Sequence, residues 1–187
     1  MYQVQKYGLY LFVLLFIMPF LQLNSQIVYT HGFTELLKEA HLDYYKPLEE
    51  WYHVSPKKRD KYMKYDLVLL NESTDREVRY YIKTYQDDVL DQIPHVSMMR
   101  LIQHIATNDE NAEIRAVILD QDLLENRFNA DWGICQYFIP KKSYSDLPFG
   151  ALISIYAKGK STAYAVILYS DIEFEPLKNF YQLRFRE

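Results

Sequence analysis

The chain has 187 residues, with 21 lysines and arginines, 25 aspartates and glutamates, and a single cysteine. A hydrophobic fraction of 49% and a charged fraction of 25% exclude a disordered chain, and the length predicts one domain rather than several. A net charge of −4 gives no support to nucleic-acid binding, and one cysteine excludes both an internal disulfide and a CxxC zinc site.

The first 25 residues have the composition of a secretory signal. Lys6 is the only charged side chain among them, and residues 7–21 that follow it are almost entirely apolar. This stretch is shorter than the ~20 apolar residues that a membrane-spanning helix needs. We therefore expect residues 1–25 to be a cleaved signal peptide and 26–187 to be a single exported domain. Retention of residues 7–21 as a membrane anchor is the alternative.

The mature chain begins with short elements. Helix-forming residues with apolar side chains three and four apart predict a helix over Phe33–His41. Aromatic residues predict short strands at Tyr44–Tyr45 and Trp51–Val54. Residues 57–64 hold five basic side chains and one acid. We interpret them as a solvated loop, and contact with an anionic partner is the alternative.

A β-hairpin is predicted over Tyr65–Leu70 and Glu77–Thr84, because the intervening Asn, Ser, Thr and Asp residues favour a turn. The second strand alternates an apolar set with a basic and aromatic set: Val78, Tyr80 and Ile82 against Arg79, Tyr81 and Lys83. Side chains on a strand alternate between its two faces. We therefore expect the apolar set to be buried and the basic and aromatic set to form a stripe on the open face.

The second half predicts a helix, several strands and a final helix. Pro94–Ala106 reads as a helix that starts at a proline, with an apolar face formed by Val96, Met99, Leu101, Ile102 and Ile105. The elements expected after it are a strand at Ile114–Leu119, a short helix at Asp122–Asn129, strands at Trp132–Ile139, Phe149–Ala157 and Thr162–Tyr169, and a helix at Glu175–Phe185. Gly159 should take a positive φ in the tight turn between the last two strands.

This order of elements predicts the fold class. Strands joined by hairpins pair antiparallel, and the strands at 149–157 and 162–169 are apolar at nearly every position, as expected of central strands. We expect an α+β domain with a mostly antiparallel sheet and helices on both faces, that is, an α/β/α sandwich.

Motifs for catalysis or metal binding are absent from the sequence: there is no GxGxxG, Walker loop, HExxH, GxSxG, EF-hand or CxxC. We therefore expect no cofactor and no metal. Asp120, Asp122 and Glu125 lie close together, and we interpret them as a helix start capped by Asp122 rather than as a calcium site. Cys135 lies in an apolar stretch and should be a small buried hydrophobe rather than a nucleophile.

Three residues outside the hairpin are candidates for a ligand site. Asp131 and Trp132 lie where a helix gives way to a strand, and the indole could form the wall of a cleft or anchor the core. His95 and His104 are nine residues apart on one helix, so at most one of them can point toward the sheet. We take His95 as the third candidate.

The layout resembles PsbP-like domains. The residues that carry the resemblance are LDYYKPLEEWYHV at 42–54, the hairpin at 65–82, and the helix PHVSMMRLIQHI at 94–105. The resemblance covers most of 33–187 and rests on element order. That family includes extrinsic photosystem subunits, a Ran-binding protein and bacterial exported proteins. It implies an antiparallel sheet between helices and a non-enzymatic binding or accessory module, and it carries over no site residue.

From these observations we expect an exported, non-enzymatic protein that binds an unknown protein or small ligand of the cell envelope. The candidate ligand-binding residues are Arg79, Tyr81, Lys83, His95, Asp131 and Trp132. We expect no nucleic-acid partner, and contact with a membrane only if residues 7–21 are retained. An exported hydrolase that uses His95 or Asp131 as its acid or base is the alternative.

Overall fold

A computed structural model describes five parts of the chain: residues 31–45, 52–56, 63–85, 93–180 and 182–187. The predicted signal peptide at 1–25 and most of the basic stretch at 57–64 lie outside the described residues. Within the described residues, no helix is both long enough and apolar enough to span a membrane.

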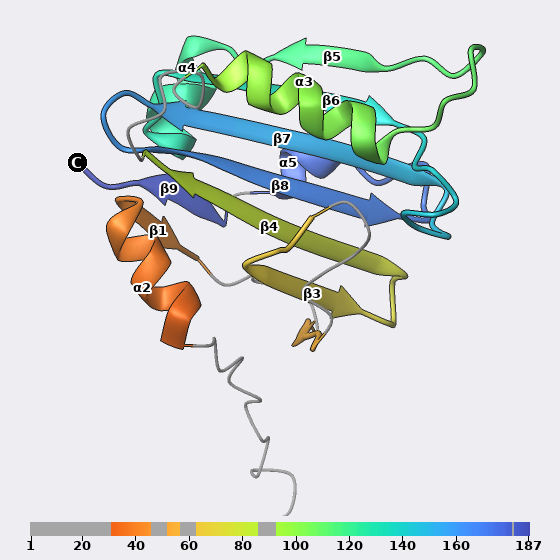
Figure 1. The fold of residues 1–187 in the computed structure, drawn as a ribbon, viewed down its shortest axis with the longest axis horizontal. Helices are drawn as coiled ribbons and strands as arrows, with labels where there is room; N and C mark the ends of the chain where they lie inside the picture. The colour runs from red at the N-terminus through yellow and green to blue at the C-terminus, as the bar shows by residue number, and fades with distance from the viewer. Residues whose placement is uncertain (1–30, 46–51, 57–62, 86–92, 181) are drawn as a thin grey trace, which may run out of the picture.

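The fold is α+β, and its main sheet has seven strands in which every pairing is antiparallel (Figure 1). Across the sheet the strands are β2 (His53–Val54), β3 (Leu67–Asn71), β4 (Arg76–Thr84), β8 (Ser161–Tyr169), β7 (Phe149–Ala157), β6 (Trp132–Phe138) and β5 (Arg115–Ile118). A second, two-stranded sheet pairs β1 (Leu42–Tyr44) with β9 (Leu183–Phe185).

The apolar strands lie at the centre of the sheet, as predicted. β8 is buried at all nine of its positions, between β4 and β7. Gly159 has a φ of 73° in the turn that joins β7 to β8, which confirms the predicted left-handed position. The hairpin between β3 and β4 is also confirmed, and the Asn71 carboxamide oxygen accepts a hydrogen bond from the Ser73 backbone N–H at 3.1 Å.

Four helical segments accompany the sheets. They are α2 (His31–Glu39), α3 (Pro94–Ile105), α4 (Gln121–Leu123), which continues as the π-helical turn η3 (Leu124–Phe128), and α5 (Pro176–Asn179). α3 lies across the sheet over β6 and β7 in Figure 1. Its predicted apolar face was wrong at one position, because Met98 is buried and Met99 is 47% exposed.

The predicted helix cap was also wrong by two residues. Asp120, not Asp122, is the N-cap of α4, and its carboxylate accepts a hydrogen bond from the Leu123 N–H at 2.8 Å. Asp122 instead accepts a hydrogen bond from the Asn126 side chain at 2.6 Å. The acidic residues therefore stabilise this helical segment, which ends at Asn129 in a left-handed conformation.

The predicted C-terminal helix over Glu175–Phe185 was wrong. α5 is only four residues long, and the chain then forms β9, which pairs with β1 in the register Leu42 to Phe185. The pairing wins because it buries Leu183 and Phe185 almost completely and joins the Arg186 N–H to the His41 carbonyl at 2.8 Å.

The core consists of two hydrophobic clusters that use alternate residues of the main sheet. One cluster contains Met98, Leu101, Ile102 and Ile105 of α3, packed against residues such as Leu152 and Val166. The other contains side chains from α2, β1 and β9, packed against residues such as Tyr80 and Ile153. We call the face of the sheet that packs against α3 the α3 face. The three candidate residues of the hairpin, Arg79, Tyr81 and Lys83, lie on this face.

Candidate functional site

Two predicted residues far apart in sequence lie in one row across the α3 face. Lys83 is opposite Thr162, Thr162 is opposite Tyr156, and Tyr156 is opposite Trp132. Side chains directly opposite each other in antiparallel strands share a face. With strands about 4.8 Å apart, three steps place Lys83 and Trp132 about 14 Å from each other.

The next row places a pair of tyrosines beside this one. Tyr81 is opposite Tyr164, and their rings are stacked, with centroids 5.7 Å apart and an interplanar angle of 18°. Tyr164 is buried, whereas Tyr81 is half-buried. The stacked pair therefore presents a rigid aromatic surface toward α3.

Arg79 does not belong to an exposed stripe, which corrects the sequence prediction. It is only 3% exposed, and its guanidinium donates two hydrogen bonds to the Glu77 carboxylate, at 2.8 and 3.1 Å. The Tyr144 ring lies 4.4 Å from the guanidinium carbon, and the Tyr144 carbonyl accepts a third hydrogen bond at 3.4 Å. The loop that carries Tyr144 covers this end of β4. Arg79 is therefore buried, and it forms a structural ion pair with Glu77.

His95 and Asp131 both have partners near Trp132. The His95 ring lies 4.8 Å from the Trp132 ring, although the imidazole itself is exposed. The Asp131 carboxylate accepts a hydrogen bond from the Lys158 N–H at 2.6 Å and so holds the β7–β8 turn. The structure thus brings His95 and Trp132 together and gives Asp131 a role in the turn.

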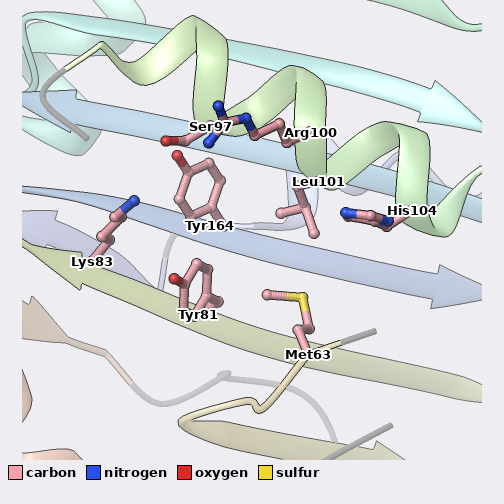
Figure 2. Close-up of a pocket in the computed structure, with 8 residues that line it drawn as sticks. All are labelled: Met63, Tyr81, Lys83, Ser97, Arg100, Leu101, His104 and Tyr164. Atoms are coloured by element: carbon pink, nitrogen blue, oxygen red, sulfur yellow. The ribbon is translucent and has the colours of Figure 1, made fainter. Parts of the chain in front are cut away.

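A small groove opens between α3 and the edge of the hairpin (Figure 2). Its volume is about 150 Å³. The side chains that line it come from α3, β4, β8 and the segment before β3: Met63, Tyr81, Lys83, Ser97, Arg100, Leu101, His104 and Tyr164. We call it the α3 groove. Of the six sequence candidates, Tyr81 and Lys83 line it.

The charge of the α3 groove is one-sided. Lys83 on β4 and Arg100 on α3 contribute two cations, and His104 adds an imidazole ring. Among the described residues that line the groove, no side chain is acidic. Ser97 and the two tyrosines supply neutral hydroxyl groups. The arrangement is chemically suited to a small anionic group.

The helical contribution to this groove was missed at the sequence level. Ser97, Arg100, Leu101 and His104 are spaced by three, four and seven residues, so they lie on one face of α3. The spacing is visible in the sequence. The spacing indicates a site only once α3 is known to lie beside Lys83, and no local sequence pattern predicts that position of α3.

Two other hollows accompany the remaining candidates. One has a volume of about 330 Å³ and is lined by Glu77, Arg79 and the loop residues 142–147. The other has a volume of about 210 Å³ and lies beside Asp131 and Glu125. Both mix acidic side chains with their polar lining, so neither has the one-sided charge of the α3 groove.

Cys135 is fully buried, as predicted for a small hydrophobe. Burial raises the pKa of its thiol to about 11, and a weaker hydrogen bond involving Tyr137 lowers it only in part. The protonated thiol is a poor nucleophile. Within the described residues, no three His, Cys, Asp or Glu side chains gather in a way that could hold a metal ion.

Comparison with known proteins gives no relative: no family model, no curated protein and no solved structure matches this chain.

Proposed function

We propose that this protein is a non-catalytic binding module that holds an anionic group in the α3 groove. The observation that carries the proposal is that Lys83 from β4 and Arg100 from α3 line one cavity, with His104 of α3 farther along it, and that none of its described lining residues is acidic. Hydrogen bonds from cationic donors to carboxylate or phosphate oxygens are about twice as strong as neutral ones. A small anion in this groove would gain such bonds from two separate elements.

The walls of the groove support this function. Leu101 is 8% exposed and Tyr164 is 1% exposed, so both are held in place by the core beneath them. Apolar walls lower the local dielectric, which strengthens the attraction between a cation and a bound anion. A fixed wall also reduces the side-chain entropy that binding would otherwise remove.

An NMR titration of the full chain with inorganic phosphate and with acetate tests the proposal. We expect amide shifts that map to α3 and β4, and an affinity that falls at higher salt. Arg100→Gln and Lys83→Met should each weaken binding roughly tenfold, since each removes about one charge-assisted hydrogen bond. Lys38→Gln, on the exposed side of α2, changes the charge equally and should leave the affinity unchanged.

The opposite results would refute an anion site in the α3 groove. They are a titration without localised shifts, or a loss of affinity in Lys38→Gln as large as the loss in Arg100→Gln.

The proposal includes export and an accessory role in the cell envelope, where the partner would be a protein or a small ligand. The basis is the lysine and apolar stretch of residues 1–25. N-terminal sequencing of the mature protein tests export: a start at Gln26 supports it. A mature chain that still contains residues 7–21 would favour a membrane-tethered protein instead.

We also propose the finer description of the fold, an α/β/α sandwich of the PsbP-like kind. Its support is that α3 packs in one core cluster while Phe33 and Leu37 of α2 pack in the other. An experimental structure with α2 and α3 on the same face of the sheet would contradict it.

The hydrolase alternative has no specific support among the described residues. Asp131 is engaged with the Lys158 N–H, and His95 contacts the Trp132 ring rather than a nucleophile. His95→Ala and Asp131→Asn would test it on a panel of ester and glycoside substrates. Turnover that both variants abolish would replace the binding function with catalysis.

A further inference from the structure

We propose that the ligand of the α3 groove is a single aromatic ring that carries an anionic substituent, as in an aryl carboxylate or an aryl phosphate. This inference rests on the proposed anion-binding function and adds the requirement for the ring. It follows from three properties of the groove: the position of its cationic side chains toward one end, its volume, and its aromatic wall.

The cationic side chains Lys83 and Arg100 lie toward one end of the α3 groove. Figure 2 shows the Lys83 ammonium, the Ser97 hydroxyl and the Arg100 guanidinium at one end, with the Tyr164 hydroxyl directed toward them. Leu101 and Met63 lie at the other end, where the His104 imidazole is the polar group. A ligand that satisfies both ends must itself have a charged head and an apolar body.

The volume limits that body to about one ring. The groove holds about 150 Å³, and an engineered protein cavity of about this size accommodates one benzene molecule. Drug-sized ligands occupy pockets of ~300–1,000 Å³. A fused bicyclic ring or a long alkyl chain would therefore extend out of the groove into solvent.

The wall of the groove favours a flat body over an aliphatic one. Tyr81 and Tyr164 are stacked on each other at 5.7 Å, so both rings keep a fixed orientation. An aromatic ligand can meet such a pair edge-on or offset, the two arrangements that the ring quadrupole favours. The buried hydroxyl of Tyr164 is directed toward the polar end, and the ring of the half-buried Tyr81 is the part of the pair that a ligand can reach.

Paired probes on the full chain separate the ring from the charge. Benzoate is compared with acetate, and phenyl phosphate with inorganic phosphate, by NMR titration or calorimetry at low salt. We expect at least one aryl anion to bind about tenfold more tightly than its ring-free counterpart, because the ring buries apolar surface against Leu101 and Met63. Benzyl alcohol, which has the ring without the charge, should bind more weakly than the aryl anions. Naphthoate should bind no more tightly than benzoate, because its second ring would lie in solvent.

Variants of the protein then test whether the ring of the ligand contacts Tyr81. Tyr81→Leu should remove the advantage of benzoate over acetate, whereas Tyr81→Phe, which retains the ring, should keep it. Arg100→Gln should weaken benzoate and acetate by the same factor, since it acts on the charge alone. Thermal melting confirms that each variant is folded, and the comparison of probes on the unmodified protein does not depend on any variant.

The outcomes distinguish this inference from the function on which it rests. Equal affinities for aryl and ring-free anions would overturn the aromatic ligand and leave the anion site standing. Binding of benzyl alcohol as tight as that of benzoate, with no binding of phosphate or acetate, would overturn both.

Discussion

Glu77→Ala should strongly destabilise this protein, because it leaves the Arg79 guanidinium buried without its carboxylate. Arg79 is 3% exposed and Glu77 is 15% exposed, so the guanidinium loses its carboxylate in a largely desolvated position. Burial alone would lower the pKa of Arg79, but the hydrogen bond to Glu77 and the neighbouring Tyr144 raise it by more, so the group stays charged. The substitution therefore leaves a buried cation rather than a neutral base.

The size of the effect follows from the two hydrogen bonds between these side chains, at 2.8 and 3.1 Å. Each hydrogen bond to a charged group contributes about 1.5–3 kcal/mol. Breaking a buried ion pair by removing one partner typically costs about 3–5 kcal/mol. The hydrogen bond to the Tyr144 carbonyl is longer, at 3.4 Å, and neither it nor the contact with the Tyr144 ring supplies a negative charge. We expect the free energy of unfolding to fall by about 3–5 kcal/mol.

Urea unfolding followed by circular dichroism measures this loss. Glu113→Ala, at an exposed carboxylate just before β5, is the control and should change stability by no more than about 0.5 kcal/mol. The double variant Glu77→Leu with Arg79→Met removes both charges and should recover most of the stability. A loss below about 1 kcal/mol for Glu77→Ala, or a double variant as unstable as the single one, would refute the explanation.

Four further predictions concern the two glycines Gly150 and Gly159 and the buried thiol of Cys135. Gly150→Ala should cost about 1–3 kcal/mol, because its Cβ would lie 2.6 Å from the Phe138 ring, whereas Gly32→Ala meets nothing within 4 Å and should be harmless in the same urea assay. Gly159→Ala should cost about 1 kcal/mol, since its φ of 73° disfavours a side chain, and an unchanged midpoint would contradict this. Cys135, whose pKa is raised to about 11, should resist a thiol reagent at mildly alkaline pH until the protein unfolds. Because its folded pKa exceeds the ordinary 9.0, this thiol's contribution to stability should be lost as the pH rises from about 9 to about 11, which alkaline urea titrations can measure.

The central part of the sheet can be predicted from local residue chemistry. The apolar strands β7 and β8 are joined by a turn that needs a positive φ, and Gly159 is the residue that provides it. The turn before β4 follows from Asn71, whose side chain caps the backbone two residues later. In both hairpins the paired strands are close in sequence. The local residue pattern is therefore enough to predict which strands pair.

The C-terminal segment shows where such reasoning stops. Leu177 and Phe180 are spaced as on a helix, which favours the wrong prediction, whereas Leu183 and Phe185 alternate as on a strand. The choice between the two depends on β1, whose Leu42 pairs with Phe185 from the far end of the chain. Local helix and strand propensities take no account of a partner so distant in sequence. The burial of Leu183 and Phe185 in that pairing favours the strand over the helix.

The same limit explains why the stripe predicted on β4 divides into two parts. Arg79, Tyr81 and Lys83 are equivalent in the pattern, since all three project from one face of one strand. Glu77 precedes Arg79 by two residues on that face and pairs with it, whereas the residues two before and two after Lys83 are Tyr81 and Tyr85. Tyr144 then covers the arginine from a distant loop, and α3 leaves a groove beside the lysine. Arg79 is thus part of a structural ion pair because its own strand supplies the carboxylate, whereas Lys83 lines a groove to which α3 adds a second cation, Arg100.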